Sequence, residues 1–349
     1  MGQTQVDVCG GDFLINGRPT LQGRTYQGHR LEGLLPNARL VQATFDDLNA
    51  ETRGMWSLPH GTPWDAGRNL SSFLQNLPRY RAAGLLAFTI NAEGGSPQGY
   101  SKHQPWHNSV FEANGRIRPA YAARVAAVLD AADALGMGVM LGIFYFGQTH
   151  RLCDAAAVLA AVDAITDLLL SRGDRHVLIE IANEQDCHAY DDSPLAGFAH
   201  GELIRRVQER SAGKVTNDAG RLLVSTSYLG GHMPEADTVE AADYILIHGN
   251  GVHASAGLGE LIDRVRAMPE YVGQPVVVNE DDHFEFDKPE NNFLAATAKH
   301  ASWGYFDYCK PGEPWEAGFQ SVPTDWRPDS HDRKRGFFKL LADMTGGRF

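Results

Sequence analysis

Two Asn-Glu pairs stand at equivalent places in the sequence, each at the end of an apolar run. Asn183 and Glu184 end the run IEIANE, and Asn279 and Glu280 end the run VVVNE. Two opposed carboxyl groups can cleave a glycosidic bond, because one protonates the leaving oxygen while the other attacks the anomeric carbon or activates water. A single such Glu would be weak evidence, since Glu180 shows that acids also occur inside these runs. The repeated pair makes Glu184 and Glu280 the candidate catalytic residues.

The elements that would position these residues form a regular alternation. Apolar segments with strand composition occur at 38–45, 84–91, 138–146, 176–183, 221–228, 243–250, 275–280 and 301–308. Segments with helical periodicity occur at 70–84, 119–136, 154–173, 199–213, 257–268 and 333–346. Strands that are apolar on both faces and alternate with amphipathic helices predict a parallel sheet covered by helices. Eight such units favour a (β/α)₈ TIM barrel, whose active sites lie at the carboxyl ends of the strands.

An open doubly wound sheet is the competing architecture, and it is disfavoured because no G-x-G-x-x-G segment follows the first strand. Asn16 and Gly17 lie between two apolar runs, which predicts a two-residue hairpin turn. Residues 10–35 are therefore expected to form an N-terminal hairpin and lead-in. No linker-like segment divides the remainder, so we expect one domain over residues 1–349.

Composition excludes several classes of partner. The chain has 31 Lys and Arg against 43 Asp and Glu, a net charge of −12, and no basic run, so nucleic acid and anionic membranes are not expected to bind. The apolar stretch at 139–147 is far shorter than the roughly 20 residues of a membrane-spanning helix. Its four cysteines form no C-x-x-C pair. Reduced thiols and the lack of a leader-like segment at 1–10 predict a cytoplasmic protein, or a secreted one whose leader has been removed.

The Asn-Glu on the fourth expected strand and the Glu on the seventh resemble the retaining glycoside hydrolases of clan A, cellulase-like (β/α)₈ enzymes that include family 5. The match is to Asn183, Glu184 and Glu280, with the two Glu 96 residues apart, and the strand pattern extends it over most of the chain. The resemblance implies an O-glycosyl hydrolase that cleaves a β-linked glycoside or oligosaccharide and needs no cofactor. It implies that Glu184 is the acid/base, Glu280 the nucleophile and Asn183 a hydrogen-bond donor to the sugar 2-hydroxyl.

Clan A enzymes often carry a His or Tyr on the sixth strand and an aromatic residue on the eighth. This chain has His248, Asn250 and Trp303 in similar places. The sequence after the sixth strand reads HGN instead of the usual His-x-Tyr, so we expect His248 or Tyr228 to orient the nucleophile. All four residues are candidates for substrate binding.

Polar residues at other strand ends are further candidates, because rigid strands position side chains well. Asn91 ends the second expected strand and Gln148 follows the third, so we expect both to contact substrate. Arg39 and Gln42 lie earlier in the first strand and fit polar positions of the core equally well.

Long loops after the first two strands, at 46–69 and 92–118, are also expected to recognise sugars, because long loops in compact domains are commonly functional. Trp106 lies in the second, and its flat apolar ring with one N–H suits stacking on a sugar. We expect about half of the tryptophans to be structural instead. The polar and aromatic loop candidates are Asp46, Asp47, His60, Glu93, Gln98, Tyr100, His103, His107 and Asn108.

Two other functions are open. The segment NEDDHFEFD at 279–287 is dense in acids and His, and with His248 and His188 it could bind a divalent metal, which would make the chain a metal-dependent barrel hydrolase. A solvated acidic loop explains the segment as well, since no H-x-H or H-E-x-x-H spacing occurs. A barrel that binds a glycan without cleaving it is the remaining alternative, but it would not need opposed Glu residues.

Overall fold

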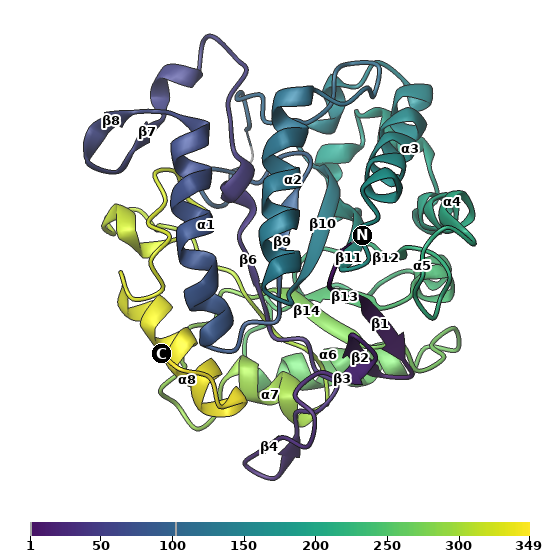
Figure 1. Ribbon diagram of the computed structural model, residues 1–349, viewed down its shortest axis with the longest axis vertical. Helices are drawn as coiled ribbons and strands as arrows, with labels where there is room; N and C mark the ends of the chain where they lie inside the picture. The colour runs from purple at the N-terminus through teal and green to yellow at the C-terminus, as the bar shows by residue number, and fades with distance from the viewer. Residues whose placement is uncertain (1, 102) are drawn as a thin grey trace.

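The computed structural model, which describes residues 2–101 and 103–349, has a ring of parallel strands at its centre (Figure 1). In chain order these strands are β6 (Asn37–Arg39), β9 (Ala87–Asn91), β10 (Gly138–Tyr145), β11 (Val177–Asn183), β12 (Leu223–Ser225), β13 (Ile245–His248), β14 (Val276–Glu280) and β15 (Gly304–Tyr305). Six of them pair in the order β12-β11-β10-β9-β6-β15, and β13 pairs with β14. Parallel bridges from Val277 to Ser302 and from Asp281 to Tyr305 join β14 to the β15 side. Between β12 and β13, the Asp243 amide donates to the Val224 carbonyl at 3.0 Å, which completes the ring.

Alternation along each strand explains how the barrel packs. Outward residues such as Phe88, Leu141 and Ile179 are apolar and fully buried under the helices. Inward residues at the amino ends of the strands, such as Met140 and Leu178, form a second apolar cluster inside the barrel. Toward the carboxyl ends the inward positions become polar. The barrel therefore has an apolar floor and a polar upper interior.

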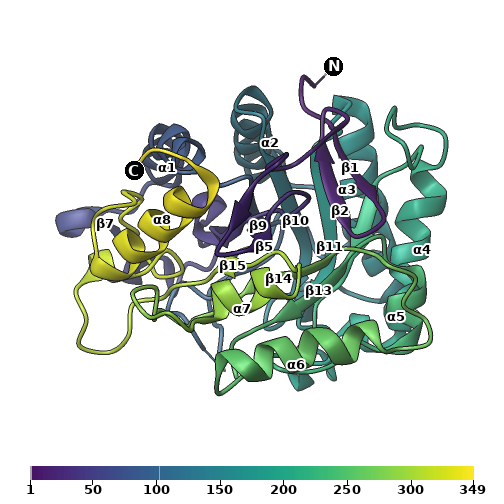
Figure 2. The ribbon, with the colours of Figure 1, turned by 90° about the horizontal axis from the view of Figure 1, so that it is seen from below.

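In the described part of the chain, eight α-helices surround the strands and follow one another around the ring (Figure 2). They are α1 (Ala66–Ala82), α2 (Pro119–Ala134), α3 (Ala155–Arg172), α4 (His200–Ser211), α5 (Ala236–Ala241), α6 (Ser255–Arg266), α7 (Asn292–Ala298) and α8 (Asp332–Thr345). Helix α3 shows how the sequence sets its ends: the Asp154 side chain accepts from the Ala157 amide, and Gly173 ends the helix with a φ of 71°. Across the described residues, every helix is too short or too polar to cross a lipid bilayer.

The N-terminal segment closes the amino end of the barrel (Figure 2). Strands β1 (Val6–Cys9), β2 (Asp12–Ile15) and β3 (Arg18–Pro19) form an antiparallel sheet. Asn16 and Gly17 join β2 to β3 with φ values of 53° and 73°, the positive pair that a type I′ turn requires. Val6 and Phe13 pack against the floor of the barrel. Two further small hairpins lie outside the barrel sheet. They are β4 (Thr25–Tyr26) with β5 (His29–Arg30) and β7 (Ser57–Leu58) with β8 (Thr62–Pro63).

The predicted barrel and the N-terminal hairpin are confirmed. Each expected strand segment overlaps one barrel strand, although several strands are shorter than expected. The first is the clearest case: β6 ends at Arg39, and the apolar residues after it form a 3₁₀ turn, Val41–Thr44. Helices α5 and α7 were not predicted, because six and seven residues are too few to show a helical period.

Candidate active site

Glu184 and Glu280 meet at the carboxyl end of the barrel. Glu280 is the last residue of β14, and Glu184 directly follows Asn183, the last residue of β11. A carboxylate oxygen of each Glu and a ring nitrogen of His248 all lie within 4.8 Å of one another. Glu184 is only 7% exposed and Glu280 only 4%. The structure therefore brings the predicted pair together in a nearly enclosed place.

Glu280 is held through both of its carboxylate oxygens. The Arg39 Nε lies 3.0 Å from Oε2, and the Asn250 Nδ2 donates to Oε1 at 2.9 Å. Arg39 is fully buried, and its Nη2 also donates to the Asn183 Oδ1 at 2.6 Å. Its Nη1 lies 3.7 Å from the Glu180 carboxylate, deeper in the barrel. One guanidinium thus connects Glu280, Asn183 and Glu180, and a bonded cation favours the ionised form of Glu280.

Glu184 is positioned by an unusual backbone conformation. Its φ is +51°, in the left-handed region, which costs an L-residue about 1–2 kcal/mol. The Ser227 Oγ accepts from the Glu184 amide at 3.0 Å and helps to fix this conformation. The His248 Nδ1 lies 3.0 Å from the Glu184 Oε1 and 3.9 Å from the Glu280 Oε2. An irregularity in the β13–β14 register between Ile247 and His248 sets His248 opposite Glu280.

Glu280 and His248 each have a shifted pKa within the cluster that they form with Glu184. Burial raises the pKa of Glu280 to about 7, while Arg39 and His248 oppose this rise and Glu184 adds to it. Burial alone would lower the pKa of His248, but the charges of Glu280 and Glu184 outweigh it and raise that pKa above its ordinary value. The cluster can therefore hold a proton near neutral pH and exchange it among neighbouring groups.

Tyr100 reaches over this cluster from the β9–α2 loop. The Asn250 Nδ2 donates to its hydroxyl at 2.8 Å, and the hydroxyl in turn donates to the Asp282 Oδ2 at 3.4 Å. The Tyr100 ring packs against Tyr308 and Phe306, with centroid separations of 4.8 and 5.6 Å. Burial of the hydroxyl and the nearby Glu280 raise the pKa of Tyr100, so it remains a neutral phenol.

The remaining strand-end candidates have different surroundings. Asn91 is fully buried in the barrel interior, and its amide has no hydrogen-bond partner among the described residues, so a role in binding stays a prediction. Gln148 accepts from the Asn108 amide at 3.0 Å and donates to the Trp106 carbonyl at 3.1 Å. Trp106 is 1% exposed and packs edge-to-face on Trp56. Gln148 and Trp106 therefore stabilise the β9–α2 loop, and a contact of either with substrate stays a prediction.

Tyr228 and Trp303 also make their contacts within the protein, and a contact of either with substrate stays a prediction. The Tyr228 hydroxyl lies 2.7 Å from both the His200 Nδ1 and the Thr238 Oγ1, so Tyr228 joins α4 and α5 and does not orient Glu280. Trp303 is 1% exposed and stacks on Phe293 behind the barrel wall. Side chains along a strand and its extension point alternately to opposite faces, so the Trp303 side chain points away from the mouth of the barrel. Asn250 orients the nucleophile candidate instead, from the place of the expected Tyr.

The acidic segment after β14 does not converge with Glu280. Asp281 points to the opposite side, where its Oδ2 accepts from the Trp303 Nε1 at 2.7 Å and the Asn292 Nδ2 at 2.8 Å. Its Oδ1 lies 2.6 Å from the His283 Nδ1. The Asp281 carboxylate thus has partners within the protein, and Asp281, Asp282 and His283 form a group separate from Glu184, His248 and Glu280.

Glu184, His248 and Glu280 are near enough to one another to ligate one ion. The Arg39 Nε lies 3.0 Å from Glu280, and its fixed positive charge already neutralises the carboxylate and would repel a divalent cation. The donor set therefore fits two acids held by an internal cation better than it fits a metal site.

Sequence reasoning missed the role of three residues at this site. Arg39 was expected to be a polar core residue, and it is, but it also binds Glu280. Tyr100 was one of many loop candidates. Tyr145, at the end of β10, lies near the pair, and burial together with Glu280 raises its pKa. The available sequence signal for Arg39 was a charged residue inside an apolar strand. The signal for Tyr145 was an aromatic residue at a strand end.

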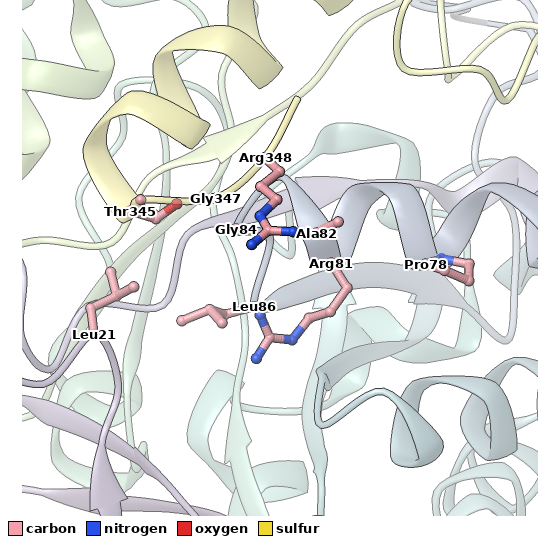
Figure 3. A pocket seen from close by; sticks show the side chains of 10 residues that line it. Leu21, Pro78, Arg81, Ala82, Gly84, Leu86, Thr345, Gly347 and Arg348 are labelled. Atoms are coloured by element: carbon pink, nitrogen blue, oxygen red, sulfur yellow. The ribbon is translucent and has the colours of Figure 1, made fainter.

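A cavity of about 510 Å³ lies at the other end of the barrel (Figure 3). Leu86, just before β9, lines it together with the last residues of α1 and α8, and Arg81 and Arg348 border it. Its lining side chains include two guanidinium groups and no carboxylate. The paired acids at the mouth are therefore the candidate active site.

No family model matches the sequence, and no curated protein does either. Solved structures are similar over most of the chain. A family 5 mannosidase from Rhizomucor miehei matches 99% of this chain and 98% of its own, at 11% identity and a TM-score of 0.56. A GH5-4 endoglucanase from Bacteroides salanitronis matches 89% and 93%, at 11% identity and 0.57.

Some matched chains are much longer. A GH2 β-galacturonidase from Eisenbergiella tayi matches 99% of this chain at 12% identity and a TM-score of 0.55, but this chain spans only 55% of it. It likewise spans 61% of a matched chain from Bacteroides vulgatus. At such low identities the likeness concerns the fold. The chain thus has the (β/α)₈ fold of these glycoside hydrolases, and the predicted resemblance to clan A is confirmed at that level.

Proposed function

We propose that this chain hydrolyses β-linked O-glycosides with retention of anomeric configuration, with Glu280 as nucleophile and Glu184 as acid/base. The observation that carries the proposal is the meeting of Glu184 and Glu280 just after β11 and at the end of β14, where one carboxylate oxygen of each lies within 4.8 Å of the other. Retaining enzymes place their carboxyl groups about 5–5.5 Å apart, while inverting enzymes need roughly 6.5–9.5 Å to fit a water molecule. The similar folds of known glycoside hydrolases support the same class of reaction.

The surroundings of each Glu agree with its role. In the first step the Glu280 carboxylate forms a bond to the anomeric carbon as the bond to the leaving oxygen breaks, and the proton of Glu184 passes to that oxygen. Arg39 and Asn250 favour the ionised form of Glu280 and orient its carboxylate. His248 contacts Glu184. It can therefore balance the charge of the Glu184 carboxyl group as the Glu184 proton leaves and returns. In the second step Glu184 takes a proton from water as the water oxygen bonds to the anomeric carbon and the bond from that carbon to Glu280 breaks, which releases the sugar.

The proposal is tested with a panel of 4-nitrophenyl β-glycosides. We expect the wild type to hydrolyse at least one of them, and nuclear magnetic resonance of the first product to show the β-anomer. Glu184→Gln should lower turnover of a substrate with a poor leaving group by roughly 10²–10⁴-fold, the usual contribution of a positioned acid. Glu280→Gln should abolish turnover. Glu285→Gln, the same change at an exposed site five residues away, should have no effect.

Azide separates the two roles. In Glu184→Ala the small anion should restore turnover of an activated glycoside and give the β-glycosyl azide, because it attacks the glycosyl-enzyme. In Glu280→Ala it should give the α-glycosyl azide, because it replaces the nucleophile. Release of the α-sugar by the wild type, or wild-type turnover by either Gln variant, would contradict the mechanism. Sugar binding without any turnover would favour the glycan-binding alternative.

A further inference from the structure

Tyr100 crosses the mouth of the barrel. It belongs to the loop after β9, whose neighbours in the sheet are β6 and β10. Its hydroxyl contacts Asn250 and Asp282, which follow β13 and β14 on the other side of the ring. Tyr100 is 53% exposed, so one side of the ring faces solvent while the hydroxyl end covers Glu280. The ring therefore forms a wall above the nucleophile.

The loop that carries Tyr100 is fixed to the loop after β15. Gln98 forms an antiparallel bridge with Ser321, and the Val322 amide donates to the Pro97 carbonyl at 2.8 Å. The Ser321 Oγ accepts from the Cys309 amide at 2.8 Å, which holds the second loop in turn. Tyr308 and Phe306 pack on the Tyr100 ring from this loop. The wall is thus continuous from the β9 side to the β15 side.

The position of this wall relative to the two acids limits what can bind. The sugar that becomes attached to Glu280 must lie beside that residue, with Asn250 and Tyr100 around it. The leaving group must lie beside Glu184, which gives it a proton. A second sugar residue beyond the attached one would meet the ring of Tyr100, whose hydroxyl accepts from the Asn250 Nδ2 at 2.8 Å. We therefore place the remainder of the glycan on the Glu184 side, where the leaving group takes its proton.

Resting on the proposed function, we propose that this is an exo-acting glycosidase, which accepts one terminal sugar residue on the Glu280 side and releases it as a monosaccharide. Tyr100 sets this limit by closing the site beyond that residue. A glycan would enter with its non-reducing end first, and the remainder of the chain would leave as the aglycone.

The test compares the products of two substrates with the same leaving group. They are the 4-nitrophenyl β-glycoside that the panel shows to be hydrolysed fastest and the β-1,4-linked bioside of the same sugar. We expect the bioside to give a monosaccharide and the 4-nitrophenyl monoside first, so that nitrophenol appears only after a lag. Release of the intact disaccharide without a lag would overturn the inference. No hydrolysis of any glycoside would contradict the proposed function itself, a result that is readily distinguished.

Variants of Tyr100 test its role. Tyr100→Ala should release intact disaccharide and raise the ratio of direct to stepwise cleavage by about tenfold, the size of effect of one pocket contact. Tyr26→Ala, the same change at the amino end of the barrel, should keep the wild-type pattern, and thermal unfolding of both variants checks that they fold. An unchanged product pattern in folded Tyr100→Ala would show that Tyr100 does not close the site.

Discussion

At the scale of single residues, Arg39 controls the charge of the site. It is a cation inside the barrel with no exposed surface on its side chain, and it lies between Glu280, Glu180 and Asn183. A buried charge is tolerated only when it is paired and hydrogen-bonded. Because its partners include the nucleophile candidate, the pairing that stabilises the fold also keeps Glu280 in the form that can attack.

This arrangement predicts the pH dependence of the reaction. Only ionised Glu280 can attack, and burial raises its pKa to about 7, so kcat/KM should fall as the pH drops below about 7. Asn250→Ala removes a donor to the carboxylate and should move this acid limb upward by about one pH unit. A hydrogen bond to a charged group contributes about 1.5–3 kcal/mol, and one pKa unit corresponds to about 1.4 kcal/mol.

Profiles of kcat/KM against pH for the wild type and Asn250→Ala provide the measurement. A loss of activity in the variant that is equal at every pH would show that Asn250 does not act on the ionisation of Glu280. Glu285→Gln again serves as the control, since it changes net charge by the loss of one exposed carboxylate.

The sequence revealed the two Glu residues because each ends an apolar run, and strand ends in a barrel converge. It could not reveal which side chains contact them. Asn250 and Tyr100 lie 30 and 180 residues from Glu280 along the chain, and their meeting depends on loop conformation. The contacts of Trp303 and Tyr228 were equally hidden in the sequence, because a shift of one residue turns a side chain to the other face.

At the scale of elements, a buried acid attaches the β9–α2 loop to β10. The Glu93 carboxylate accepts from the Ser109 Oγ at 3.1 Å and from the Thr149 Oγ1 at 2.8 Å. Burial raises the pKa of Glu93 to about 7, although both hydroxyls oppose the rise. The loop that carries Tyr100 thus begins at a carboxyl group that prefers to be protonated.

Glu93 should therefore make stability depend on pH. Its folded pKa lies above the unfolded value, so its contribution is complete below about pH 4.5 and is lost as the pH rises through about 7. At about 1.4 kcal/mol per pKa unit, the loss is of the order of 3 kcal/mol. The free energy of unfolding of Glu93→Gln should not show this decrease as the pH rises. The measurement is urea unfolding of both proteins at pH 5 and pH 8. An equal change in the free energy of unfolding for both would contradict the assignment.

Elements with a long, clear pattern were predictable, and short ones were not. Helix α3 has 18 residues and a capping Asp, and its expected range, 154–173, differs from the observed one by a single residue at each end. Helix α1 begins at Ala66, four residues before its expected start, because the capping role of Asp65 was not considered. Boundaries of this kind depend on local hydrogen bonds, which a hydrophobic pattern does not record.

At the scale of the whole molecule, the N-terminal hairpin and the barrel share one core. Phe13 is fully buried and packs edge-to-face on Tyr244, and Leu178 and Met140 belong to the same cluster. Phe13→Ala should lower the free energy of unfolding by about 3–5 kcal/mol, the cost of a large cavity in a core. Val272→Ala, at a residue that is 83% exposed, should change it by less than about 0.5 kcal/mol. Denaturant titration measures both, and similar small effects would show that the hairpin is not part of the core.

The closed amino end of the barrel also determines the order in which substrate, aglycone and water enter and leave the site during turnover. The hairpin closes the floor, and under the proposed exo action Tyr100 closes one side of the mouth, so reactants and products would share the opening beside Glu184. The aglycone must depart through it before water can arrive to release the sugar from Glu280. At high concentration, a second glycan waiting in that opening would compete with water, so the enzyme would build glycosidic bonds as well as break them.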